Sequence, residues 1–281
     1  NEAAFSNAKS GQLDIVMVAP NYALEEIDGM HIENLETMDV RNISLPCIPE
    51  QVVKNPDGNE VTVGNNVTSD VAVRKALSIG INRESIINNA LNGIGKPATG
   101  FTTNLSWGNP LVYEDNQREE AKKLLEDAGW IDSDGDGIRE KDGVKCEFDV
   151  YSPSSDQQRY LLAVAVAEDA KELGISINAK QGTWDELTAK ANTDGIVWGW
   201  GQYSPTVLKS LLYSELFLVG DYDNTVGYSN EEVDKLIDEA IDSNNQEDAI
   251  KKWKEVQTVS AEDYPYLYIV NIEHSYFIND S

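Results

Sequence analysis

Strand-like and helix-like stretches alternate along most of this chain, and this alternation restricts the possible folds more than any other feature. Residues 145–151, 175–179 and 196–201 have the alternating, β-branched or aromatic pattern of strands. A long stretch of helical periodicity at 156–173 separates the first two, and another helix is predicted to begin after Thr183. Strands that alternate with helices form layered sheets with right-handed crossovers, so we predict an α/β fold with flanking helices.

Capping residues mark the starts of several predicted helices. A Ser, Thr, Asp or Asn side chain placed before a stretch with apolar periodicity can accept the free N–H groups of the first turn. Two of these starts have the capping-box pattern, in which a Glu three residues later bonds back to the cap. The predicted starts are Asn21, Thr68 or Ser69, Asn82, Asp115 or Asn116, Thr183 with Glu186, and Ser229 with Glu232.

The two ends of the chain and residues 29–66 are less regular. Residues 13–19 are almost continuously apolar, as in a strand covered on both faces, and 266–270 and 274–278 are predicted as two further strands. We interpret residues 29–66 as connecting strands and loops, with turns at 55–58 and 64–66, and residues 101–113 as a loop. The chain starts as if inside a helix and ends soon after a strand, so we expect both ends to be trimmed.

A segment with two tryptophans and two glycines, residues 196–201, is the most informative for function. Trp198 and Trp200 are separated by one residue and therefore point to the same side of a strand. The next residues, Gln202, Tyr203 and Ser204, form a loop rich in hydrogen-bonding groups, and the backbone at Gly201 is open to close approach. One interpretation is the rim of an α/β ligand cleft that uses all six residues. The other is a core strand with two packed tryptophans.

The acidic loop at residues 132–140 matches the first half of a calcium-binding loop. Asp132, Asp134 and Asp136 occupy positions 1, 3 and 5, the carbonyl of Ile138 occupies position 7, and Glu140 occupies position 9. Position 12, where a bidentate Glu belongs, is a glycine, and a strand is predicted where the second helix of an EF-hand would follow. A structural calcium ion is one interpretation. An acidic surface turn that bonds its own backbone is the other.

Composition excludes several classes of function. The net charge is -27, from 49 acidic and 22 basic residues, which argues against a nucleic-acid partner and against binding to an anionic membrane surface. No apolar stretch approaches the roughly 18 residues that a membrane-spanning helix needs. The two histidines and two cysteines lack metal-ligand spacing, and no nucleophile elbow, phosphate-binding loop or zinc-protease helix is present. We therefore expect no enzyme activity and no required cofactor.

Several linked motifs resemble one protein family. Residues 70–77 (Asp-Val-Ala-Val-Arg-Lys-Ala-Leu) and 81–86 (Ile-Asn-Arg-Glu-Ser-Ile) are similar to the D-V-R-V-R-x-A-L and I-D-R-E-x-I segments of extracellular solute-binding proteins of peptide and nickel ABC transporters. Residues 95–98 resemble the family's G-x-P-A turn. Residues 121–130, followed by the acidic loop, resemble its A-K-x-L-L-x-E-A-G-W and D-x-D-G-D-G stretch. Their common order along the chain makes the resemblance more specific than any single motif.

That resemblance implies a periplasmic-binding-protein-like (type II) fold with two lobes, of which this chain is the C-terminal half. Residues 1–67 would be part of the first lobe, 68–263 the second, ligand-binding lobe, and 264–281 a return to the first lobe. It implies a small-molecule or peptide ligand and ABC permease subunits as partners. It also implies an extracytoplasmic location, in the periplasm or at the cell surface, with a lipid anchor outside this fragment as the only membrane attachment.

One departure from the family concerns the ligand. Peptide binders of the family usually carry an aspartate just after the Trp-Gly strand, where it holds the amino terminus of the peptide. Here no acidic residue lies between Gly195 and Glu215. A peptide ammonium would lose its charge-assisted partner, so a neutral or anionic solute, or a metal chelate carried by a small molecule, is an alternative to a peptide. A sensory or adhesive extracellular domain with the same fold is the alternative to transport, and a hydrolase is the third hypothesis.

Overall fold

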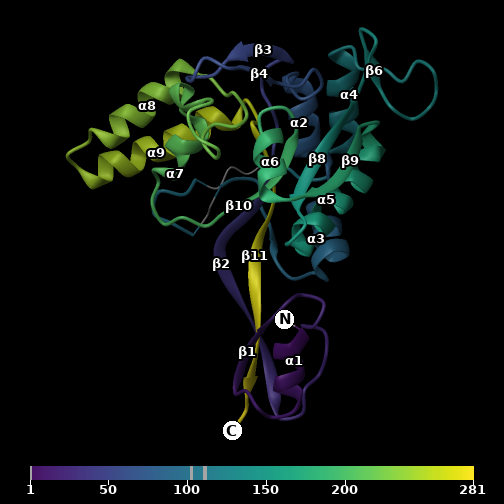
Figure 1. The fold of residues 1–281 in the computed structure, drawn as a ribbon, viewed down its shortest axis with the longest axis vertical. Coiled ribbons are helices and arrows are strands. Elements are labelled where there is room, and N and C mark those ends of the chain that lie inside the picture. The colour runs from purple at the N-terminus through teal and green to yellow at the C-terminus, as the bar shows by residue number, and fades with distance from the viewer. Residues whose placement is uncertain (1, 102–103, 110–112) are drawn as a thin grey trace.

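Two units of unequal size lie along the long axis of the protein and are joined by two long strands (Figure 1). The computed structural model describes residues 2–101, 104–109 and 113–281. The small unit contains α1 (Glu2–Lys9) and β1 (Ile15–Val18). From it, β2 (Met30–Ser44) and β11 (Tyr266–Asn279) run side by side into the large unit, paired antiparallel over most of their length.

The main sheet is mixed, with strand order β1-β11-β2-β10-β8-β9 and β5 (Lys96–Pro97) paired to β11. Three strands of the large unit are parallel to one another, namely β10 (Gly195–Trp200), β8 (Glu147–Pro153) and β9 (Ser176–Gly182). Strand β10 is antiparallel to β2, which links this parallel group to the long pair. The carboxyl ends of β8, β9 and β10 therefore meet at one edge of the sheet.

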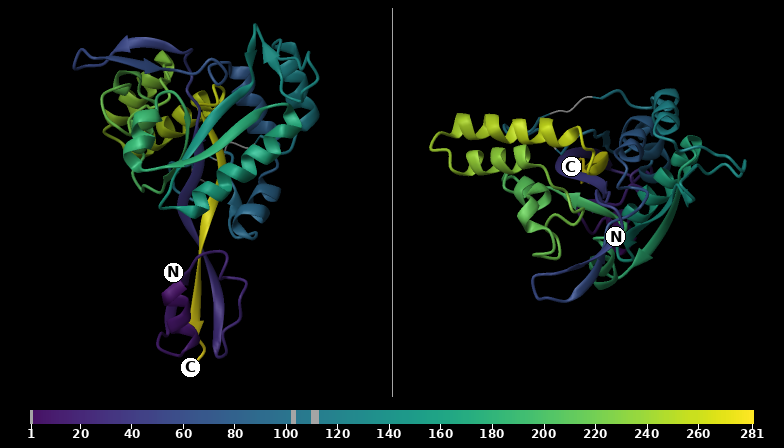
Figure 2. Two further views of the ribbon diagram at one scale, coloured as in Figure 1. Left: turned by 45° about the vertical axis from the view of Figure 1, so that its right-hand side comes forward. Right: turned by 90° about the horizontal axis from the view of Figure 1, so that it is seen from above.

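Helices cover both faces of the sheet and form two groups that extend to different sides of the strands (Figure 2). The first group comprises α2 (Val71–Gly80), α3 (Arg83–Leu91), α4 (Arg118–Asp127) and α5 (Gln157–Ala170), which continues into the 3-10 turn η1 (Lys171–Leu173). The second comprises α7 (Val207–Leu212), the turn η2 (Ser214–Leu216), α8 (Glu231–Ile241) and α9 (Gln246–Ala261). Helix α6 (Trp184–Lys190) follows β9. Two small antiparallel hairpins lie outside the main sheet. One pairs β3 (Gln51–Lys54) with β4 (Glu60–Val63), and the other pairs β6 (Glu140–Lys141) with β7 (Val144–Lys145).

Each group of helices has its own hydrophobic core. Helices α2 to α5 enclose a core against β8 and β9 that includes Leu77, Leu125 and Leu162. Helices α7 to α9 enclose a second core around Trp253 and Val233, and the small unit has a separate core. None of the helices in the described ranges is both long enough and apolar enough to cross a membrane.

The predicted α/β fold is confirmed, and several helix starts need correction. The capping box of Thr183 and Glu186 is present as predicted. Helix α2, however, is capped by Asp70, since the hydroxyl of Thr68 donates instead to the carbonyl of Pro46 at 2.8 Å. Helix α8 is capped by Asn230, one residue later than the predicted capping box.

Two further helix predictions fail for local reasons. Helix α4 begins after Gln117 rather than at 115 or 116, because a carboxylate oxygen of Asp115 accepts the backbone N–H of Arg83 at 2.9 Å. No helix forms after Asn21, where the chain makes only consecutive turns with i to i+3 hydrogen bonds. A stretch this short cannot offset the cost of helix nucleation without a packed apolar face.

The strands at the two ends of the chain differ from the prediction. The strand predicted at 13–19 is only Ile15–Val18, and it is covered on one face rather than both, since Ile15 and Met17 are exposed. The two expected strands at 266–270 and 274–278 are one strand, β11, with register shifts between Tyr268 and Val270 and between Asn271 and Glu273. Within 29–66, β2 alone spans 15 residues, and the predicted turn at 55–58 closes the β3–β4 hairpin. The predicted loop at 101–113 includes 102–103 and 110–112, which lie outside the described residues.

The register shifts lie where the long strand pair passes from one unit to the other. There the hydroxyl of Thr37 donates to the carbonyl of Ile272 at 2.7 Å and accepts from the backbone N–H of Asp39 at 3.1 Å. Beyond this point, Val40 and later residues of β2 pack into the cores of the large unit. Strand β2 therefore passes from the small unit to the large unit near residue 39. The predicted division at 67 and 263 stays a prediction.

Candidate ligand-binding site

A groove of about 970 Å³ lies between the small unit and the carboxyl edge of the parallel strands. Residues 19–22 of the small unit line one side, and Asp156, Arg159 and Trp184 line the other. These three follow β8 and β9 directly, where an α/β sheet most often binds its ligand. The topology therefore places the loops after β8, β9 and β10 around one edge, although these loops are far apart in the sequence.

Trp198 is buried and fits the core-strand interpretation of its segment. Only 4% of its surface is exposed, and its Nε1 donates to the hydroxyl of Ser44 at 3.1 Å. Its ring stacks on that of Trp184, with centroids 6.0 Å apart and planes 19° apart. Trp198 therefore supports the position of Trp184, which reaches the groove, and offers little surface of its own.

Trp200 is half-buried, on the same side of β10 as Trp198. The ring centroids of the two tryptophans are 6.0 Å apart, as expected for residues separated by one position in a strand. The Nε1 of Trp200 is buried and has no hydrogen-bond partner within the described part of the chain. An unpaired buried donor is costly, so this indole is a place where a ligand or water oxygen would be stabilising.

The polar loop after β10 is exposed, and neither this loop nor Trp200 is among the residues that line the groove. Tyr203 is 77% exposed, and its carbonyl accepts from Nε1 of Trp107 at 2.9 Å. The hydroxyl of Ser204 bonds to that of Thr206 at 2.8 Å, and Gln202 is exposed. A Cβ atom at Gly201 would lie 3.4 Å from Asp39, an ordinary contact distance. The loop is thus fixed at one carbonyl and one hydroxyl, which leaves the phenol of Tyr203 and the amide of Gln202 accessible.

Two arginines that the sequence analysis did not single out converge on Gly199. Strand pairing places Arg41 of β2 opposite Gly199 of β10, and Arg159 comes from the first turn of α5. A Cβ atom at Gly199 would overlap Nη1 of Arg41 and would lie 2.9 Å from Nη2 of Arg159. The glycine leaves space for both guanidinium groups, and a glycine inside a strand was the only sequence signal for this close approach.

Both arginines are largely buried, with side chains 12% and 14% exposed for Arg41 and Arg159. Arg41 is paired with Asp39, and Nε of Arg159 lies 3.2 Å from Oδ2 of Asp156. The guanidinium of Arg159 also lies over the ring of Trp184, 5.4 Å from its centroid. Burial, and then the like charge of Arg41, lower the pKa of Arg159.

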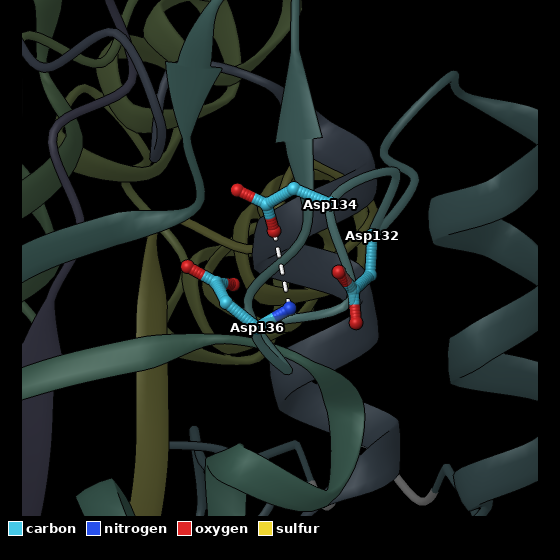
Figure 3. A group of neighbouring side chains, drawn as sticks. All are labelled: Asp132, Asp134 and Asp136. Carbon is cyan, nitrogen blue, oxygen red and sulfur yellow. Dashed lines mark hydrogen bonds between the residues drawn. The ribbon is translucent and has the colours of Figure 1, made fainter.

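The acidic loop brings its three aspartates together (Figure 3). One carboxylate oxygen from each of Asp132, Asp134 and Asp136 lies within 4.8 Å of the other two, and no other such group of His, Cys, Asp or Glu occurs among the described residues. The carboxylates also accept backbone N–H groups of their own loop, for example Asp134 from Asp136 at 3.1 Å. Both the ion-binding and the surface-turn interpretations are compatible with this arrangement.

The remaining predicted ligands of this loop are differently placed. Glu140 accepts from the backbone N–H of Ser133 at 2.9 Å, and Ile138 donates its own N–H to Asp136 at 2.9 Å. The hydrogen bond from Lys145 is the main cause of the lowered pKa of Asp136. The ammonium group of Lys145 therefore neutralises part of the negative charge of this loop. Calcium binding by the loop stays a prediction.

The cysteines and histidines form no catalytic group among the described residues. Burial raises the pKa of Cys47 to about 11 and that of Cys146 to about 12, so both thiols stay protonated at neutral pH. His31 is exposed and paired with Asp280, with 2.6 Å between Nδ1 and Oδ1. These environments differ from those of activated nucleophiles and bases.

Comparison with known proteins decides the family. The model of "Bacterial extracellular solute-binding proteins, family 5 Middle" matches residues 1–215. The chain belongs to this family. The resemblance inferred from the motifs at 70–77, 81–86 and 121–130 is therefore confirmed.

Relatives of this family 5 chain match it over most of its length but over only part of theirs. Protein XP55 of Streptomyces lividans is 29% identical over 97% of this chain and 48% of its own length. The oligopeptide-binding protein AppA of Bacillus subtilis is 32% identical over 73% of this chain and 39% of its own. The chain thus spans about half the length, or less, of the curated relatives it matches.

Solved structures confirm the periplasmic-binding-protein-like (type II) fold. AppA from Bacillus subtilis in complex with a nonapeptide superposes with a TM-score of 0.77 at 25% identity, covering 99% of this chain and 54% of AppA. NikA from Brucella suis in complex with Fe(III)-EDTA superposes with a TM-score of 0.82 at 20% identity, covering 99% of this chain and 55% of NikA. At 20% identity, the likeness to NikA shows a shared fold alone.

Proposed function

We propose that this chain is about half of the extracytoplasmic solute-binding component of an ABC importer. In this proposal its large unit is one of the two lobes that enclose the ligand. The observation that carries the proposal is the groove at the carboxyl edge of β8 and β9, between two units joined by a strand pair. Family membership supports a binding role, and the ligands held by AppA and NikA set the range of solutes to test, from peptides to metal chelates.

The proposed binding residues lie at the end of β10, in the loop that follows it, and just after β9. Trp200 supplies an aromatic surface and an unpaired Nε1 donor, and the exposed Gln202, Tyr203 and Ser204 orient the solute by hydrogen bonds. Gly201 keeps the backbone accessible. Trp184, held by the buried Trp198, adds an aromatic surface that lines the groove.

Closure of the cleft would use the two long strands as a hinge. Hinges in binding proteins are a few residues that absorb a change of backbone angles. The register shifts in β11 and the Thr37 hydroxyl bridge across to Ile272 mark such a point, since the regular strand ladder is interrupted there. In this proposal the first lobe includes the small unit, the protein works outside the cytoplasm on a lipid anchor, and the permease subunits are its partners.

Isothermal titration of the full-length protein that contains this chain, with a panel of peptides and metal chelates, tests this function, because this chain alone holds only part of the cleft. A solute that binds wild type should bind Trp200→Ala at least about tenfold more weakly, because an aromatic contact and one donor are lost. Ile241→Ala is the control, since Ile241 is 45% exposed at the end of α8, an element separate from β10 and its loop. Equal affinity of Trp200→Ala and wild type would remove Trp200 from the site. No binding by any member of the panel would contradict the function.

A further inference from the structure

One side chain from the large unit is buried in the core of the small unit. Ile94, which lies between α3 and β5, is 6% exposed and belongs to the hydrophobic cluster of the small unit. Among the described residues, the other buried members of this cluster come from the small unit itself: Phe5, Ala8, Val16, Val18, Ala23, Ile27 and Phe277. Leu91 before Ile94 and Ala98 after it pack instead in the two cores of the large unit. The chain therefore leaves the large unit for a few residues, inserts one side chain into the small unit and returns.

From this insertion we propose that residues 92–97 form a strap between the two units, which limits how far the ligand cleft opens. Ile94 is the anchor of the strap in the small unit. This role rests on the proposed function, because it matters only if the two units enclose a solute. The strap adds a third connection to the two long strands β2 and β11, from a segment that is separate from both of them in the sequence.

Polar contacts fix the strap near both of its ends. The side-chain amide of Asn92 donates to the carbonyl of Pro20 in the small unit at 3.2 Å. Lys96 is paired with Glu36 of β2. Strand β5 pairs with β11 at 270–271, between the two register shifts of β11. The strap thus contacts the small unit and both long strands where the two units meet, and Figure 1 shows α3 at the end of the large unit nearest the small unit.

Glycines on both sides of Ile94 allow the strap to turn. The φ angles of Gly93 and Gly95 are +78° and +129°, which other residues rarely adopt. The N–H of Gly93 donates to the carbonyl of Ile87 at 3.2 Å, so α3 ends there. At Gly95 a Cβ atom would lie 2.6 Å from Cγ2 of Val270, so the strap passes very close to β11. Ile94 can therefore follow a rotation of the small unit while α3 stays in the core of the large unit.

Burial of Ile94 opposes separation of the two units more than rotation between them. Withdrawal of its side chain would expose apolar surface, at a cost in free energy that grows with the exposed area. A rotation about the two glycines keeps the side chain buried. The strap also adjoins the candidate site, since Asn89, Ala90 and Asn92 at the end of α3 line the groove. Opening of the cleft is therefore restrained beside the groove itself.

Distances between two spin labels, measured by double electron–electron resonance on the full-length protein without solute, test the strap. Glu26→Cys in the small unit and Glu168→Cys in α5 carry the labels at exposed positions, and Cys47→Ser removes the partly exposed native thiol. Ile94→Ala should widen the distribution of distances at least about twofold, because the apolar contact that ties the units together is lost.

Ile86→Ala is the matched control. Ile86 lies on α3, is 1% exposed and packs in the core of the large unit, so the same atoms are removed away from the small unit. This control should lower the stability and keep the wild-type distribution of distances. Asn92→Gly is a second variant in case Ile94→Ala fails to fold. Glycine accepts the φ of +54° at this position, so the variant loses the hydrogen bond to Pro20, and it should widen the distribution less than Ile94→Ala but more than the control.

The strap is overturned if Ile94→Ala keeps the wild-type width of the distribution, or if Ile86→Ala widens it equally. If Ile94→Ala does not fold, a wild-type width in Asn92→Gly overturns it. The strap and the proposed function fail separately. Unchanged widths, together with binding of a peptide or chelate, would leave the binding function in place and remove the strap. A distribution widened by Ile94→Ala, with no binding by any member of the solute panel, would support the strap as a connection between the units and contradict the proposed function.

Discussion

Asp70 provides the most quantitative test of the structure, because one carboxylate has three partners. Its Oδ1 accepts the backbone N–H of Ala72 at 2.9 Å and so caps α2. Its Oδ2 accepts from Nε1 of Trp130 at 3.0 Å and from Nζ of Lys141 at 2.8 Å. Trp130 is 2% exposed, and Asp70 supplies the acceptor for its indole N–H.

Two substitutions separate these contributions. Asp70→Asn can keep the cap but turns an amide NH₂ towards the donors of Trp130 and Lys141. We expect it to lower the free energy of unfolding by about 2–3 kcal/mol, because it leaves a buried donor unpaired and breaks a half-buried ion pair. Asp70→Ala loses the cap as well, which adds about 1 kcal/mol. Asp57→Asn, at the exposed tip of the β3–β4 hairpin, should change stability by less than about 0.5 kcal/mol.

The assay is urea unfolding at several pH values. Burial alone would raise the pKa of Asp70, but the hydrogen bonds from Lys141, Ala72 and Trp130 outweigh it and leave the pKa below its ordinary value. A lowered folded pKa contributes stability above the unfolded value of about 3.9, and this is lost as pH falls through the folded pKa. The difference between wild type and Asp70→Asn should therefore be full at pH 7 and shrink below about pH 4. A stable Asp70→Asn at pH 7 would refute the reasoning.

Three other predictions follow from local geometry. Gly64→Ala should destabilise the protein by more than about 2 kcal/mol in urea unfolding, because φ is +81° and the new Cβ would lie 2.6 Å from the carbonyl carbon of Pro49. The calcium hypothesis predicts that calcium chloride, but not equal magnesium chloride, raises the Tm and that Asp134→Asn removes the effect. An unchanged Tm would favour the surface turn. The buried thiol of Cys146 should react with a disulfide reagent at pH 8 only after unfolding, because burial also raises its pKa to about 12. Fast labelling of Cys146 in the native protein would contradict its burial.

The parallel part of the fold could be predicted from the sequence because its strands and helices have clear periodicities. Helix α5 and strand β8 bury apolar faces, which leave a pattern in the sequence. Strand β2 leaves no such pattern, because residues 33–36 are exposed in succession and only its later residues are buried. Its length depends on pairing with β11, more than 200 residues later in the chain, and a local pattern does not report that pairing.

In the candidate site, too, local sequence patterns could be recognised, whereas contacts between distant segments could not. The loop after β10 could be located because tryptophans and glycines are conspicuous within a strand. Arg41 and Arg159 could not be located, because their approach to Gly199 depends on the register of β10 with β2 and on the packing of α5. Asp70 was noticed as part of a family motif. Its role as the cap of α2 and partner of Trp130 became visible only with the structure.

Hydrogen exchange in the presence of the solute tests the central claim most directly. The solute would be identified by mass spectrometry of what co-purifies with the protein, and exchange would be measured with and without it. The account predicts slower exchange at residues 154–159, 183–184 and 200–204, around the carboxyl edge of the parallel strands. Protection confined to the acidic groove between α8 and α9, with none at that edge, would contradict it.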